Sequence, residues 1–173
     1  YAQGATPVGV ETYANSRRLE KSLRLQNADL ETEYNLYEAG LARPKVKAVD
    51  FHGKEAYVAQ RELDQQAAYL CTLVLEDTTD SQGVVRYPVG MWPLLDKDSG
   101  EVLVDSHGRR SYATSVVYGP SLGKNIVLGY LPVERAIEGE TVVMEYFGES
   151  FPARIEAVGY RPLLHPKNER VHQ

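Results

Sequence analysis

One stretch near the end of the chain decides the fold: Glu140-Thr-Val-Val-Met-Glu-Tyr-Phe-Gly-Glu-Ser-Phe-Pro-Ala-Arg-Ile-Glu-Ala-Val158. Two runs rich in apolar and β-branched side chains, 140–147 and 151–158, flank Gly148–Glu149. A glycine supplies the positive φ that a tight turn requires, so this stretch predicts a β-hairpin. The hairpin in turn predicts an antiparallel sheet in this part of the chain.

Working outward from the hairpin, short apolar runs recur along the preceding seventy residues. Polar segments separate them, such as the glycine-containing loop from Glu76 to Gly83. Short strands divided by turn signals favour a small antiparallel barrel or sandwich. The additional predicted strands are 69–75, 91–95, 101–104, 111–118 and 125–131.

The sequence before about residue 67 has a helical texture instead. Residues 8–25 predict a helix with Leu19 and Leu23 one turn apart, and residues 53–66 predict a second helix, since they are rich in Glu, Ala, Gln and Lys and contain no proline. A short strand is expected at 44–49. The fold class is therefore α+β. We predict two units, a short helical remnant at 1–66 and a small antiparallel β-barrel at 67–173.

Composition limits the classes of function. The 173 residues are 43% hydrophobic and 25% charged, as in a globular protein able to bury a core. The net charge of -5 provides no basic field for a phosphate backbone, so we expect no nucleic-acid partner. We expect no membrane span, because no apolar stretch approaches the roughly 20 residues that one requires. The single cysteine, Cys71, cannot form an internal disulfide, which fits a reducing cytoplasm.

Generic motifs predict no catalytic centre. The four histidines lack the spacing of a zinc site, and no cysteine pair accompanies them. Cys71 lies in an apolar strand pattern, which favours a buried and inert thiol. The segment 119–124 lacks the spacing of a phosphate-binding loop. Adjacent Ser106 and His107 on a turn cannot reach each other as a nucleophile and its base must.

Four segments, taken in order, resemble the glycine-cleavage T-protein family. Together they extend over roughly residues 8–160, and the resemblance implies the end of a folate-binding region followed by the family's C-terminal barrel. The four segments are Ser16-Arg17-Arg18-Leu19-Glu20, similar to the family's Arg-Leu-Glu helix end; Tyr37-Glu38-Ala39-Gly40-Leu41, similar to its Glu-Ala-Gly-Leu turn; Asp50-Phe51-His52-Gly53-Lys54-Glu55-Ala56, similar to its Asp-Phe-Ile-Gly-Lys-Glu-Ala helix start; and Gly119-Pro120-Ser121-Leu122-Gly123-Lys124, similar to its Ser-Pro-Thr-Leu-Gly-Lys segment.

The resemblance implies tetrahydrofolate as cofactor and three residues that bind it. Glu20 takes the place of a glutamate that hydrogen-bonds the pterin ring; the alternative is a solvated helix glutamate paired with a nearby arginine. Trp92 takes the place of an aromatic residue that packs against folate, and the alternative is a core or interface tryptophan. Arg86 is a candidate partner for folate's glutamate tail; the alternative is a solvated loop arginine.

The family includes enzymes that transfer aminomethyl groups and relatives that demethylate small methylated substrates. The long loops 77–89 and 98–110, and Tyr13-Ala14-Asn15 in place of the family's Arg-Asp pair, favour a demethylase-like member. The family's catalytic aspartate falls upstream of Tyr1. We therefore expect these residues to be the C-terminal part of an enzyme whose missing N-terminal part completes the site, and to be inactive alone. The alternative is a non-catalytic folate-binding or assembly module.

Overall fold

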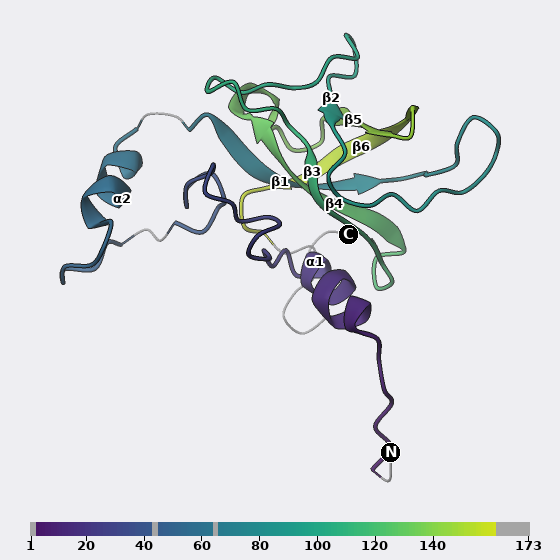
Figure 1. Ribbon diagram of the computed structural model, residues 1–173, viewed down its shortest axis with the longest axis horizontal. Helices are drawn as coiled ribbons and strands as arrows, with labels where there is room; N and C mark the ends of the chain where they lie inside the picture. The colour runs from purple at the N-terminus through teal and green to yellow at the C-terminus, as the bar shows by residue number, and fades with distance from the viewer. Residues whose placement is uncertain (1–2, 43–44, 64–65, 162–173) are drawn as a thin grey trace.

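The computed structural model describes residues 3–42, 45–63 and 66–161 (Figure 1). Its centre is one antiparallel sheet of six strands in the order β2-β5-β6-β1-β4-β3. Two short helical segments, η1 with α1 and then α2, precede the sheet along the chain, and a 3-10 turn, η2, follows β4. The strands are β1 (Ala68–Leu75), β2 (Leu94–Leu95), β3 (Ala113–Gly119), β4 (Lys124–Pro132), β5 (Thr141–Tyr146) and β6 (Glu149–Val158); the helical segments are η1 (Thr12–Arg17) with α1 (Arg18–Glu20), α2 (Lys54–Arg61) and the 3-10 turn η2 (Val133–Arg135).

The sheet curls until its two edges meet. The lead into β3 is bridged to the lead into β2 at Tyr112 and Pro93. The Ala113 N–H donates to the carbonyl of Trp92 at 2.8 Å, and the Leu94 N–H donates to the carbonyl of Ser111 at 3.0 Å. These bonds join the start of β3 to the start of β2, so the two edges of the sheet are paired at that end. The predicted α+β fold with a small antiparallel barrel is confirmed.

The predicted hairpin forms β5 and β6, with its turn one residue earlier than expected. Tyr146 pairs with Glu149, so the turn residues are Phe147 and Gly148, at φ of 53° and 78°. Two positive φ values are the mark of a type I′ turn, whose twist matches that of the flanking strands. Inside the curled sheet, the alternate residues Phe151, Ala153 and Ile155 of β6 join the main core.

Strand β1 is buried on both faces, which explains its unbroken apolar sequence. Cys71, Leu73 and Leu75 face the main core, whereas Leu70 and Val74 face a second cluster on the outer side of the sheet. That second cluster is completed by residues from the N-terminal part of the chain. Its members are Leu19, Ala39, Ala68, Leu70, Val74, Ile126, Leu128 and Tyr130. The unit boundary near residue 66 stays a prediction, but this packing places α1 and the following loops directly on the sheet.

The first helix is shorter than predicted, ending at Glu20 rather than near residue 25. Ser22 lies at φ 55°; its N–H donates to the Leu19 carbonyl, and the Leu23 N–H donates to the Arg18 carbonyl. This pair of bonds is a Schellman motif, which ends a helix through one left-handed residue. Glycine usually occupies that position, so the serine concealed the helix end in the sequence.

Three other expectations were wrong in detail. The helix predicted over 53–66 spans Lys54–Arg61, and residues 64–65 lie outside the described part of the chain. Residues 45–49 form no strand, and the remaining residue of the predicted strand 44–49 is outside the description. The predicted strand 101–104 makes only isolated bridges, at Val102 and Val104. Within the described residues, no helix has the length and apolar character needed to cross a membrane.

Candidate functional site

Glu20, the residue predicted to bind the pterin, is the last residue of α1 and only 4% exposed. Its Oε1 accepts the backbone N–H of Ser121 at 2.7 Å. Ser121 lies in the turn between β3 and β4, about a hundred residues further along the chain. Glu20 is thus a buried carboxylate that satisfies a turn, and the alternative of a solvated helix glutamate is wrong.

The β3–β4 turn needs a glycine because it is packed tightly on Glu20. A Cβ at Gly119 would lie 3.2 Å from Glu20 Oε1 and 2.6 Å from Cδ1 of Ile126. The carbonyl of Gly119 also accepts N–H groups from Leu122 and Gly123, at 3.1 and 2.8 Å. Because a side chain at Gly119 has no room, the turn and the end of α1 form one packed unit.

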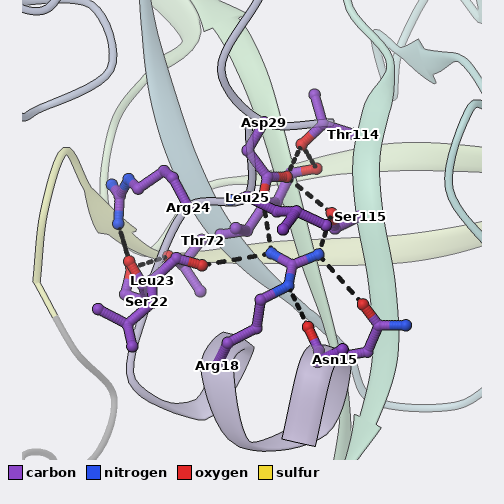
Figure 2. Close-up of polar contacts among 12 residues, drawn as sticks. Asn15, Arg18, Ser22, Leu23, Arg24, Leu25, Asp29, Thr72, Thr114 and Ser115 are labelled. Atoms are coloured by element: carbon purple, nitrogen blue, oxygen red, sulfur yellow. Dashed lines mark hydrogen bonds and ion pairs between the residues drawn. The ribbon is translucent and has the colours of Figure 1, made fainter. Parts of the chain in front are cut away.

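Arg18 connects α1 to its surroundings through a buried ion pair with Asp29 (Figure 2). Its Nη1 lies 2.6 Å from Oδ2 of Asp29, and the exposed fractions of the two side chains are 10% and 0%. Its Nη2 donates to Ser115 Oγ of β3 at 2.8 Å, and its Nε donates to the Ala14 carbonyl at 2.6 Å. One guanidinium therefore joins η1, the loop after α1 and the edge strand β3.

The Asp29 carboxylate is fully satisfied by donors. Oδ1 accepts the hydroxyls of Thr114 and Ser115 at 2.5 and 2.7 Å, and Oδ2 accepts the Leu25 N–H at 2.9 Å as well as Arg18 (Figure 2). A buried ion pair is tolerated when its remaining hydrogen-bonding capacity is filled in this way. Sequence reasoning missed Asp29, because an aspartate in a polar loop carries no local signal of a partner on β3.

A second arginine connects the barrel to the same N-terminal segment. Arg109, from the 98–110 loop, forms ion pairs with Asp105 at 2.7 Å and Glu38 at 2.5 Å. Its guanidinium lies 4.3 Å from the ring centre of Tyr34, which stacks on Tyr130 of β4 with centroids 3.5 Å apart. Burial raises the pKa of Tyr34 above its ordinary value. The long loop thus contributes to the packing of residues 31–42 on the sheet.

Trp92 lies just before β2 and is partly buried against the main core. Its ring meets Tyr146 edge-on at 5.0 Å and Phe147 at 4.8 Å. Tyr146 and Phe147 also contact each other, at 4.8 Å. These three rings form a compact cluster beside the β5–β6 turn, and Phe147 is 75% exposed. One side of the Trp92 ring is therefore packed, as expected for the alternative of a core or interface tryptophan.

Arg86 lies in the loop between β1 and β2 and pairs with a carboxylate of its own loop. Its Nη2 and Nε lie 2.5 and 2.6 Å from Oδ2 of Asp80. The other oxygen of Asp80 accepts N–H groups from Gln82 and Val84, and the Val84 bond contributes most to keeping the pKa of Asp80 low. The Arg86 side chain is 46% exposed, so it combines a local structural role with access to solvent.

The three predicted ligands thus lie on separate elements, each with its own partners: Glu20 under the β3–β4 turn, Trp92 before β2 and Arg86 in the β1–β2 loop. Over the described ranges, no group of three or more His, Cys, Asp or Glu side chains is arranged to hold a metal ion. The chemistry available at these positions is recognition by a carboxylate, an aromatic ring and a guanidinium.

Comparisons with known proteins agree with the resemblance of the four segments. Residues 93–158 match the family model of the glycine cleavage T-protein C-terminal barrel domain. An aminomethyltransferase of Desulfitobacterium hafniense is 31% identical over 157 residues, which are 89% of this chain and 38% of that protein. Mitochondrial dimethylglycine dehydrogenase of Rattus norvegicus is 29% identical over 147 residues, which are 83% of this chain and 15% of that protein.

The fold is also found in a solved structure. The glycine cleavage system aminomethyltransferase T from Bartonella henselae superposes with a TM-score of 0.63 at 20% identity, over 90% of this chain and 38% of that one. The chain therefore spans between 15% and 38% of the length of these relatives. The expected resemblance to the T-protein family and its C-terminal barrel is confirmed.

Proposed function

We propose that this chain is the C-terminal part of a tetrahydrofolate-dependent methyl- or aminomethyl-transferase or demethylase, and that it supplies part of the folate site. The match of residues 93–158 to the T-protein barrel carries the proposal, and the names of the two relatives support it. The other partners are a small methylated or aminomethyl substrate and an N-terminal part of the same polypeptide that holds the catalytic acid. A reducing cytoplasm is the proposed location.

Within this proposal, Glu20 binds the pterin. A carboxylate accepts two parallel N–H donors from a 2-amino-pyrimidinone edge, which suits that ring. In this structure the Glu20 carboxylate is covered, since it is 4% exposed and already accepts the Ser121 N–H. Pterin binding therefore requires the β3–β4 turn to move away from the carboxylate.

Trp92 and Arg86 have supporting roles in the proposal. Trp92 presents the side of its ring that does not face Tyr146 and Phe147 to the folate ring system. Arg86 attracts the glutamate tail, with part of its charge compensated by Asp80. Because exposed charge pairs contribute at most about 1 kcal/mol, removing Arg86 should weaken binding less than removing Glu20.

The deciding experiment is calorimetric titration of tetrahydrofolate into the whole protein and its Glu20→Gln variant. Glutamine keeps an oxygen that can accept the Ser121 N–H, so the turn contact survives the change. It also places an N–H₂ group against a pterin donor. A charge-assisted bond contributes about 1.5–3 kcal/mol, so affinity should fall roughly 10- to 100-fold.

Two readouts accompany the titration. Faster hydrogen exchange at the Ser121 amide with tetrahydrofolate bound would support movement of the turn. Trp92 is the only tryptophan of these 173 residues, so protection from acrylamide that is lost in Trp92→Phe would report folate near that ring. Equal dissociation constants for wild type and variant would remove Glu20 from the site. Tight binding without turnover of any methyl or aminomethyl donor would favour the non-catalytic module.

A further inference from the structure

A groove beside α2 is separate from the positions considered so far. Its volume is about 400 Å³, within the usual range for small-molecule sites. Figure 1 shows α2 at one side of the molecule, apart from α1 and from the β5–β6 turn. The groove is formed by the segments before α2 and by Tyr57 of that helix. Its apolar lining consists of Leu36, Leu41, Val46, Phe51 and Tyr57.

One wall of the groove is aromatic. The ring of Tyr57 on α2 lies 6.4 Å from that of Phe51, in an edge-on arrangement. The Tyr57 ring also lies 5.2 Å from the ring of Tyr37, and the two ring planes are inclined by 29°. Phe51 is 38% exposed and Leu36 49% exposed, so apolar surface faces solvent here. Such a wall favours a ligand with a flat apolar body.

The helix that carries this wall has little packing of its own. It is eight residues long, and none of its residues is buried. Isolated helices of this length are marginal in water, because nucleation is costly and packing supplies most helix stability. A ligand that filled the groove would cover Tyr57 of α2, and this added packing would stabilise the helix.

The mouth of the groove is cationic. Lys45 and Lys47 line it and are exposed. Among the residues that the structure describes, neither lysine forms a hydrogen bond or an ion pair, whereas Lys54 donates to the carbonyls of Ala48 and Val49. In a chain of net charge -5, these two ammonium groups form a local positive charge beside the apolar groove. They attract an anion to the mouth.

We propose that this groove binds an amphipathic organic anion, with an apolar, preferably aromatic, body in the groove and a carboxylate at Lys45 and Lys47. The apolar lining and aromatic wall select the body, and the two lysines select the charge. The site does not depend on Glu20, so it stands or falls independently of the proposed folate function.

Three probes with one apolar body test the proposal: 4-butylbenzoate, 4-butylbenzyl alcohol and 4-butylbenzylamine, each titrated into the whole protein by calorimetry. The benzoate should bind about fivefold more tightly than the alcohol, as expected for exposed charge pairs, and the amine more weakly than both. Added salt should reduce the preference. Lys45→Gln with Lys47→Gln should bring the benzoate to the affinity of the alcohol.

Two further variants separate the contributions. Phe51→Ala should weaken the binding of all three probes by a similar factor, since it removes apolar contact area and leaves the charge of the site unchanged. Lys97→Gln, an exposed lysine paired with Asp98, should change none of them. Absence of benzoate binding, equal affinity for the alcohol, or an equal loss in Lys97→Gln would overturn the proposal. So would a dimer in sedimentation velocity that Phe51→Ala dissociates, because a second copy would then occupy the groove.

Discussion

The buried pair of Arg18 and Asp29 gives the sharpest test of how the N-terminal segment is attached to the barrel. We expect Asp29→Asn to destabilise the whole protein strongly. Oδ2 of Asp29 faces the N–H donors of Arg18 and Leu25, so an amide nitrogen in that place opposes donors. In the place of Oδ1, an amide nitrogen requires the hydroxyls of Thr114 and Ser115 to accept instead of donate. The change also leaves the Arg18 guanidinium, whose side chain is 10% exposed, without its counter-charge.

The magnitude follows from that burial. Removing one partner of a buried, hydrogen-bonded ion pair costs about 3–5 kcal/mol, whereas an exposed pair contributes about 0–1 kcal/mol. For a chain of this size, the melting temperature falls by about 2–4 °C per kcal/mol, so the variant should melt roughly 6–20 °C lower. The matched control is Asp98→Asn, whose side chain is 72% exposed in its pair with Lys97. Its effect should be under about 0.5 kcal/mol.

Urea unfolding, followed by far-ultraviolet circular dichroism and by Trp92 fluorescence, measures the effect. Trp92 lies in the barrel and circular dichroism reports the backbone as a whole, so coincident transitions for both signals indicate two-state unfolding. Arg18→Met combined with Asp29→Asn should cost less than the two single changes together, because each single change leaves one partner unsatisfied. A loss under about 1 kcal/mol for Asp29→Asn at unchanged m-value would refute the reasoning.

Three other outcomes are expected. Gly40→Ala should destabilise the fold severely, because at φ 67° its Cβ would lie 2.5 Å from the Tyr160 backbone nitrogen. The control Gly83→Ala has φ 79° but open space, so thermal melting should show a loss of only about 1 kcal/mol. Burial raises the pKa of the Cys71 thiol to about 12, so a disulfide reagent at pH 8 should label it only after unfolding. Since this folded pKa exceeds the ordinary value of 9.0, the thiol's contribution to stability is present below pH 9 and is lost as pH rises further. Backbone N–H groups lower the pKa of Asp80 below 3.8, so its contribution is present at neutral pH and is lost in acid, and Asp80→Asn should flatten the acid limb of the stability profile.

The sequence by itself determined the strands of the barrel. The alternation along β6 places Phe151, Ala153 and Ile155 on one face, and a local pattern of period two needs no knowledge of its neighbours. Gly148 likewise marked the hairpin turn, since the φ requirement of a turn is local. Short strands with turns between them were therefore predictable, with errors of one or a few residues at their ends.

The sequence was less informative where an element depends on distant partners. The helix end at Ser22 was missed because the left-handed residue is not a glycine, and Ser22 is held by contacts such as that of its hydroxyl with Thr72 of β1, 3.2 Å away. The run 101–104 has strand composition, but only Val102 and Val104 find bridging partners. The amino acids of this run favour a strand, but the curled sheet offers no neighbouring strand with which the whole run could pair.

Tertiary structure alone decided the surroundings of the predicted ligands. The spacing of Glu20 on its helix is compatible with a solvated face, but the β3–β4 turn covers its carboxylate and occupies one of its lone pairs. Asp29 and Ser115 are 86 residues apart in the chain and share a hydrogen bond only because β3 is the strand beside which α1 packs. Burial and charge pairing are properties of groups brought together across the fold, so no local pattern in the sequence encodes them.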